Sequence, residues 1–512
     1  MLTTEQDNIN TESVADGSAV ISDTPYVNTS VKRKEVPEYG RSELVLIPLS
    51  FLFSFVFIRY VLFYVTGAVS TLLYLAITTT AVVYLKKKGY AFSGFNKLLT
   101  VVVYLFSFVF TITANSTVKF FNGVFLFGAG AYLIFSVCAV RNDVDRYLPY
   151  ALKRAVFEYP MNKFSSAGDI LSDSTKNSKA STNIKRIIGG LLLAAPVTII
   201  VGSLLMAADD GIDHLFNNLF LNLDSENIIT FIRDISIALP CGFYLFGMFY
   251  RNAVRKDIKE LTDMECDYRL MKKRALGNLV FYTAAAPILI LYVMFFVSQA
   301  SYFLSAFMGK LPEEFSYAEY ARKGFFELCW IVVINLGIMM IMNLHSKNSG
   351  KEKTGVLKAY NIIFCIFTLI LIATAVSKMV MYIDVYGLTV LRVYTTWFML
   401  LCAFIFLVIF IKQFKPDMHM SRWISVGFTL MFAVLCFSRA EALIVKYNHA
   451  MGKVSSDTIR SSGILEMSDD GLLEAVNEGL ISIETAKSAS DLELPDHPTD
   501  VLNISTILLQ SK

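Results

Sequence analysis

Long apolar stretches separated by polar segments are the main pattern along this chain. Roughly 20 apolar residues in a helix cross a hydrocarbon core of about 30 Å, and backbone groups in lipid must bond within the segment. The pattern therefore predicts eleven transmembrane helices. Their ranges are 44–63, 66–85, 98–114, 120–140, 187–207, 231–250, 278–303, 325–344, 359–377, 393–411 and 424–443. Because Arg59 interrupts the first range, 44–58 paired with 67–85 would serve as well.

The distribution of Lys and Arg predicts how these helices are oriented. Positive charge beside a span resists translocation. With the N-terminus inside, the cytoplasmic segments hold 32 of the 46 Lys and Arg residues. The sequence therefore predicts an N-in, C-out topology.

Composition excludes several classes of protein. Charged residues make up 17% of the 512 positions and the hydrophobic set makes up 55%, whereas soluble domains average about 25% and about 45–50%. The bilayer is then the expected solvent, and a soluble enzyme, a secreted disulfide scaffold and a nucleic-acid-binding protein are excluded. Six of the seven cysteines lie in predicted spans and Cys266 lies in an inner loop, so we expect no external disulfide.

The predicted organisation has three parts. Residues 1–43 lack an apolar core and are expected to be a disordered cytoplasmic tail. Residues 44–445 form the transmembrane domain, with cytoplasmic loops at 141–186 and 251–277. Residues 446–512 form an acidic extracytoplasmic tail, with a helix at about 469–483 capped by Ser468-Asp469-Asp470 and a loose Pro-containing end. A disordered tail remains the alternative.

The two cytoplasmic loops carry basic amphipathic patterns. Apolar residues recur at helical spacing over 141–160 and 251–274, among Lys and Arg. These patterns predict helices on the membrane surface, with the bilayer and its anionic headgroups as partners. Docking of a membrane or signalling protein is the alternative. The stretch 161–183 is predicted to be a flexible linker.

Acidic residues gather in the predicted outer loop 208–230. Asp209 and Asp210 could bind a divalent cation or act as acid and base. Adjacent side chains point about 100° apart on a helix, however, and Asp210-Gly211 is a common turn sequence. A turn or helix cap is the favoured interpretation of this secondary acidic loop.

Ionisable residues also collect near the outer ends of the last four predicted spans. Charge within a span is costly and usually faces protein or water. The pattern predicts either a functional polar site or a network of ion pairs in which Arg392 or Arg439 neutralises Asp384 or Glu327. Deeper, Asn335 and Asn361 favour interhelical hydrogen bonds over substrate contacts. The candidate cluster comprises Glu319, Arg322, Glu327, Asp384, Tyr386, Arg392 and Arg439.

Motifs that would signal catalysis are absent from the sequence. There is no phosphate-binding glycine loop, nucleophile elbow or zinc-protease motif, and the five histidines are scattered. We therefore expect no catalytic residue, metal site or cofactor.

Several segments resemble a bacterial polytopic membrane family. They are SYAEYARKGFFEL at 316–328, YIDVYGLT at 382–389, Leu391-Arg392, residues 442–444 and Tyr447-Asn448. The family they resemble is catalogued only as domain of unknown function four-one-seven-three, related to four-one-five-three. The resemblance is densest over about 290–450. It implies a bacterial inner-membrane protein and brings no established activity. Gly387 suits a tight turn back to the membrane.

The sequence thus predicts an all-α polytopic protein of the plasma (inner) membrane. Its predicted function is that of a non-enzymatic cell-envelope component, a sensor accessory or a transporter-like protein, with the outer polar cluster as its site. The alternative is a membrane enzyme acting on a lipid-linked envelope substrate, with a carboxylate as acid or base and an arginine on a phosphate.

Overall fold

The computed structural model describes most of the chain and is all-helical there, without a strand in the described residues. The described residues are 38–62, 67–139, 147–162, 164–174, 201, 225–254, 266, 268–269, 271–272, 274, 277–307, 325–345, 355–455, 459, 462–490 and 503–512. Within these ranges, ten helices are long and apolar enough to cross a membrane. The protein is a multi-pass membrane protein, as the hydropathy pattern predicts.

A first group of long helices comes from the N-terminal half. They are α1 (Arg41–Phe57, prolonged by a π-helical turn, Ile58–Leu62), α2 (Ala68–Lys87), α3 (Gly94–Ser107) with the short α4 (Val109–Ile112), α5 (Ser116–Cys138) and α11 (Ser225–Ala253). Helix α1 packs along α11. The charge of Arg59 is neutralised there, since its guanidinium lies 3.0 Å from the buried carboxylate of Asp234.

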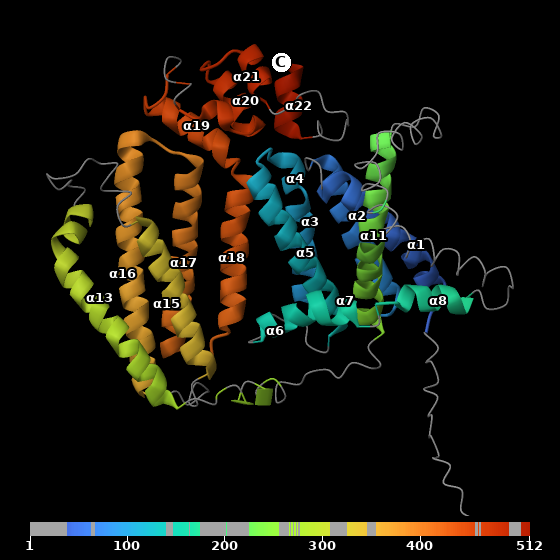
Figure 1. The fold of residues 1–512 in the computed structure, drawn as a ribbon, viewed down its shortest axis with the longest axis horizontal. Helices are drawn as coiled ribbons and strands as arrows, with labels where there is room; N and C mark the ends of the chain where they lie inside the picture. The colour runs from blue at the N-terminus through green and yellow to red at the C-terminus, as the bar shows by residue number, and fades with distance from the viewer. Residues whose placement is uncertain are drawn as a thin grey trace, which may run out of the picture. The chain divides into compact units, whose positions relative to one another are not determined.

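A second group comes from the C-terminal half (Figure 1). It contains α13 (Asn278–Phe307), α15 (Phe325–His345), α16 (Gly355–Tyr386), α17 (Val390–Phe414) and α18 (Met420–Phe437). Each group has its own apolar core. Helix α18 contacts α17 as well as α4 and α5. An edge-to-face aromatic pair supports the contact with α5, since the ring centroids of Phe125 and Phe432 lie 5.5 Å apart.

Most predicted spans correspond to helices, and three boundaries need comment. The predicted span 187–207 lies outside the described residues, except for residue 201. The prediction 359–377 was too short, because α16 continues as one helix to Tyr386 and carries Asp384 on its last turns. The prediction 424–443 was too long, because α18 ends at Phe437 and a new helix starts at Ala440.

The described part of the first basic loop is helical and packed. Residues 148–161 form α6 (Leu148–Lys153), a π-helical turn (Arg154–Glu158) and α7 (Tyr159–Met161), which agrees with the predicted helix at 141–160. The predicted linker 161–183 was wrong over α8 (Ser166–Ser174), which buries Ala167 and Ile170 against α1 and α11. Most of the second patterned segment, 251–274, lies outside the described residues.

The acidic tail folds into a compact helical unit, here called the C-terminal cap and defined as the described residues from 440 to 512. It contains α19 (Ala440–Ala450), a 3₁₀ turn (Ile464–Glu466), α20 (Asp469–Asn477), α21 (Ile483–Ala489) and α22 (Ile504–Ser511). Its apolar side chains form cores of their own, around Val445 and Leu472. The helix predicted at 469–483 begins where expected but ends at Asn477, because Gly479 with a φ of 68° ends it early. The prediction of a loose end was wrong for α22 (Ile504–Ser511), which Asn503 caps.

Candidate functional site

The cap is joined to the last span through an unusual backbone conformation at Arg439. Its φ of 47° and ψ of 60° lie in the left-handed region, and among the described residues it is the one non-glycine with a positive φ. That conformation costs on the order of 1–2 kcal/mol for a residue with a Cβ. Two contacts hold it: Arg439 Nε lies 3.1 Å from Asp470 Oδ1, and Nη2 donates to Ser505 Oγ at 2.7 Å.

Asp470 connects three segments that are distant in sequence. Its carboxylate is 1% exposed and accepts hydrogen bonds from Thr113 Oγ1 at 2.5 Å and from the Ala114 amide at 2.8 Å, both in the loop between α4 and α5. The hydroxyl of Ser505, in α22, also donates to it. Hydrogen bonds to an ionised group are about twice as strong as neutral ones, and the first turn of α20 favours negative charge. Asp470 therefore makes the main polar contacts that attach the cap to the ends of the transmembrane helices.

Glu441 makes a second connection beside it. The carboxylate is 6% exposed and accepts from Asn115 Nδ2 at 2.7 Å and from the Ser468 amide at 3.0 Å, as well as from the Ser468 hydroxyl. Burial raises the pKa of Glu441 above its usual value, and these hydrogen bonds partly oppose the rise. Asn115 also caps α5 by accepting from the Val118 amide, so Glu441 ties α19 to the start of a transmembrane helix.

A third connection joins the cap to the turn between α16 and α17. The Asn448 side chain accepts from the Leu388 amide at 2.7 Å and donates to the Leu388 carbonyl at 2.8 Å. Gly387 has a φ of 76°, and a Cβ there would lie 2.5 Å from Asn448 Oδ1. This confirms the tight turn predicted at Gly387. The turn and the α4–α5 loop lie at one end of the helices, here called the cap end.

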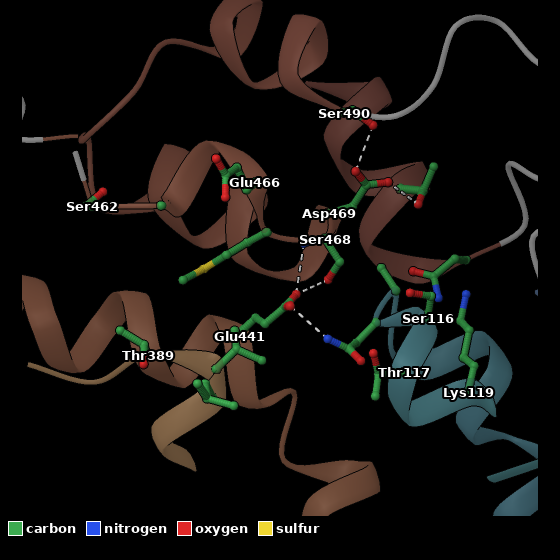
Figure 2. Close-up of a pocket in the computed structure, with 18 residues that line it drawn as sticks. Ser116, Thr117, Lys119, Thr389, Glu441, Ser462, Glu466, Ser468, Asp469 and Ser490 are labelled. Atoms are coloured by element: carbon green, nitrogen blue, oxygen red, sulfur yellow. Dashed lines mark hydrogen bonds between the residues drawn. The ribbon is translucent and has the colours of Figure 1, made fainter. Parts of the chain in front are cut away.

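A cavity of about 560 Å³ lies between the cap, the start of α5 and the start of α17. Figure 2 shows Glu441, Ser468 and Asp469 on the side of the cap, with Thr117 and Lys119 on α5. Lys119 is 3% exposed and interacts electrostatically with Asp469 and Asp470. The lining is rich in hydroxyl groups, from Ser116, Thr117, Thr389, Ser462, Ser468, Ser490 and Thr506. Such a lining suits a polar ligand of small-molecule size.

The sequence-predicted cluster separates into different environments. Arg392 places its guanidinium 3.9 Å from the Tyr382 ring centroid and donates to the Gly387 carbonyl, and the Tyr386 ring lies 5.2 Å from that of Tyr382. Arg439 instead lies between α18 and the cap and pairs with Asp470. Asp384 and Glu327 are exposed, and within the described ranges neither forms an ion pair with Arg392 or Arg439. Glu319, Arg322, Asp209 and Asp210 lie outside the described residues.

The deeper polar side chains bond to one another across helices. Asn335 accepts from the Tyr292 hydroxyl at 2.5 Å and donates to Thr368 Oγ1 at 2.9 Å. The amides of Asn343 and Asn361 exchange hydrogen bonds of 3.1 and 3.2 Å. These bonds link α13, α15 and α16 and confirm the interhelical role predicted for Asn335 and Asn361.

Sequence reasoning missed the residues that build the cavity. Asp470 was assigned only to a helix cap, and Asn115, Lys119 and Ser468 were not selected as site residues. Lys119, a cation in the first turn of an apolar helix, was the available signal. In the described residues, no group of three His, Cys, Asp or Glu side chains could hold a metal ion.

An all-helical, multi-pass membrane protein with a folded cap is the class that these features define. Within that class, the chain belongs to the family described as Domain of unknown function (DUF4153), whose model matches residues 100–476. The match confirms the resemblance, in which this family was named as the related one. It runs from α3 into α20 and so includes Asn115, Arg439 and Asp470. No curated protein and no solved structure matches the chain.

Proposed function

We propose that this protein is a non-enzymatic, receptor-like component of the cell envelope, located in the plasma membrane with its cap outside. In this proposal a small polar ligand enters the cavity beneath the cap. The observation that carries it is the cavity itself, beside which polar contacts join the cap to the ends of the spans. Polar contacts of this kind open more readily than a large apolar interface.

The connections around the cavity supply a route for a signal. Glu441 and Asp469 line the cavity, and each lies within two positions of a member of the Arg439–Asp470 ion pair: Glu441 follows Arg439 by two positions, and Asp469 directly precedes Asp470. A ligand that contacts these carboxylates would bias the Arg439 joint, and with it α18. Because α18 contacts both groups of helices, its displacement would change how they pack. The basic segments at the opposite end would present that change to a signalling protein.

Transport requires a polar path deeper in the helices. Two described polar side chains at that depth, Asn335 and Asn361, are hydrogen-bonded to neighbouring helices. A receptor needs no such path, so this arrangement supports the receptor-like function over a transporter.

Cysteine accessibility tests the proposal. On a background without the seven native cysteines, single cysteines at 117, 335 and 361 are treated with an impermeant thiol reagent from each side of the membrane. Positions 384 and 153, both exposed, serve as controls for the cap end and the opposite end. The proposal predicts labelling at 117 from outside only and no labelling at 335 or 361. Labelling of 335 and 361 alternately from the two sides would contradict it and favour a transporter. Labelling of 117 from the cytoplasm would refute the assigned orientation.

A further inference from the structure

Charge around the cavity is strongly unbalanced. Its lining contains Lys119 together with the carboxylates of Glu441, Glu466 and Asp469, and the Arg439–Asp470 pair lies directly beside it. Four carboxylates thus face two cations. In a partly enclosed site such an excess is screened less than at an open surface, so an anion is disfavoured there and a cation is favoured.

The carboxylates of the half-buried Asp469 and the buried Glu441 are hydrogen-bonded by neutral groups. Asp469 accepts from the hydroxyls of Ser490, at 2.7 Å, and Thr506. Glu441 accepts from an amide side chain and from Ser468. Neutral donors satisfy the lone pairs of a carboxylate but leave its charge in place. The negative potential of the cavity therefore persists although Asp469 and Glu441 are hydrogen-bonded.

Glu466 is the lining carboxylate that remains available. Its residue is exposed, and in the part of the chain that the structure describes its carboxylate forms no hydrogen bond or ion pair. It is the last residue of the 3₁₀ turn that follows Gly463, and it lies on the cap side of the cavity, across from α5 (Figure 2). A ligand cation could approach Glu466 without displacing a protein partner.

The form of the cation follows from the other lining groups. Hydroxyl oxygens from α5 and the cap surround the space, but no group of three metal ligands is present among the described residues. An ammonium group carries three donors in a compact charge and can bind one carboxylate and two hydroxyl or carbonyl oxygens together. A volume of about 560 Å³ accommodates an organic molecule carrying it.

We propose that the cavity binds the primary ammonium group of a small organic molecule, with Glu466 as its counter-ion. This inference rests on the receptor-like function proposed above and assigns its ligand class. The ammonium can belong to a soluble amine or to the ethanolamine headgroup of a lipid. The exposed Leu391 at the start of α17 lines the same cavity and allows contact with either source.

Binding to the full-length protein in phosphatidylglycerol nanodiscs separates these sources. Glucosamine is compared with glucose, and ethanolamine with ethylene glycol, by calorimetry. The lipid arm measures the shift in melting temperature when phosphatidylethanolamine is added to the nanodiscs. The matched variants are Glu466→Gln at the cavity and Glu484→Gln, an exposed glutamate on α21 outside the lining.

The proposal predicts that one amine-bearing probe binds, that its neutral counterpart does not, and that Glu466→Gln weakens binding at least about fivefold while Glu484→Gln leaves it unchanged. Soluble amine binding identifies a free ligand, and stabilisation by phosphatidylethanolamine alone identifies a headgroup. Equal binding of glucosamine and glucose, or no response to any amine, overturns the ammonium assignment.

Thiol labelling at position 117 keeps this inference separate from the proposed function. If position 117 is labelled from outside and an amine slows that labelling, both the receptor-like function and the ligand class are supported. If glucose slows the labelling from outside as much as glucosamine does, only the ligand class is contradicted. A cysteine at 117 that cannot be reached from outside contradicts the receptor-like function itself.

Discussion

Arg439 Nε lies 3.1 Å from Asp470 Oδ1, and this ion pair fastens the joint after the last span to the first turn of α20. The same carboxylate is bonded to the loop between α4 and α5. The Asp470 side chain therefore fixes the position of the cap relative to both the first and the second group of helices.

Replacing Asp470 with Asn should loosen the cap. The variant loses the charge that holds Arg439, and removal of one member of a buried ion pair costs about 3–5 kcal/mol. Because Arg439 is 30% exposed, we expect about 2 kcal/mol less free energy of opening, measured by hydrogen exchange of the α20 amides. Glu478→Gln, which removes a more exposed pair with His449, is the control and should cost less than about 1 kcal/mol. Equal effects of the two variants would show that Asp470 does not make the main contacts that attach the cap.

Gly387→Ala should destabilise the contact between the α16–α17 turn and the cap. A Cβ at this position would meet Asn448 Oδ1 at 2.5 Å, in addition to the backbone strain of a φ of 76°. The matched control is Gly89→Ala, where φ is 85° but nothing lies within 4 Å of the added atom. Strain alone costs on the order of 1 kcal/mol. Thermal unfolding in nanodiscs should therefore show a larger drop in melting temperature for Gly387→Ala. A drop no larger than that of Gly89→Ala would mean that the contact with Asn448 contributes little.

Glu441 should make the cap less stable as pH rises. Burial raises its pKa in the folded protein above the usual value of 4.5, so the folded state holds its proton more tightly than the unfolded state. The stability contributed by the protonated form is present below pH 4.5 and is lost as pH rises through the raised pKa. Glu441→Gln should flatten this loss, as seen in α20 hydrogen-exchange protection measured from about pH 4.5 to neutral. An unchanged pH profile would assign the titration to another group.

Asn335→Val should weaken packing without affecting the cavity. The variant removes hydrogen bonds to Tyr292 and Thr368, and such interhelical bonds contribute about 0.6 kcal/mol on average, with a maximum near 1.7. We expect a slightly lower melting temperature and unchanged labelling at position 117. Loss of function at normal stability would instead point to a transport path through Asn335.

Most of the described transmembrane helices could be predicted, because each corresponds to one apolar stretch of the sequence. The ends of the helices were less predictable. No local pattern in 424–443 indicates that Arg439 adopts a left-handed conformation, because its partners Asp470 and Ser505 are 31 and 66 positions further along the chain. The cap illustrates the same limit. Its helix at Asp469 follows from a local cap and an apolar pattern, whereas the bond between Asp470 and Thr113 spans 357 positions. The predicted pairing of arginines with Asp384 or Glu327 relied on their being near one membrane face, and the sequence contained no evidence that a tail carboxylate would compete for Arg439.

We infer that the cap closes a cavity at the outer face and that Asp470 keeps it closed. The most direct test is the rate at which an impermeant thiol reagent labels Thr506→Cys, a buried position in the cavity lining, in intact cells. We expect slow labelling from outside in the otherwise native protein and labelling at least about tenfold faster when Asp470→Asn is added. Equal rates in the two proteins, or labelling only after the cytoplasmic face is exposed, would contradict it.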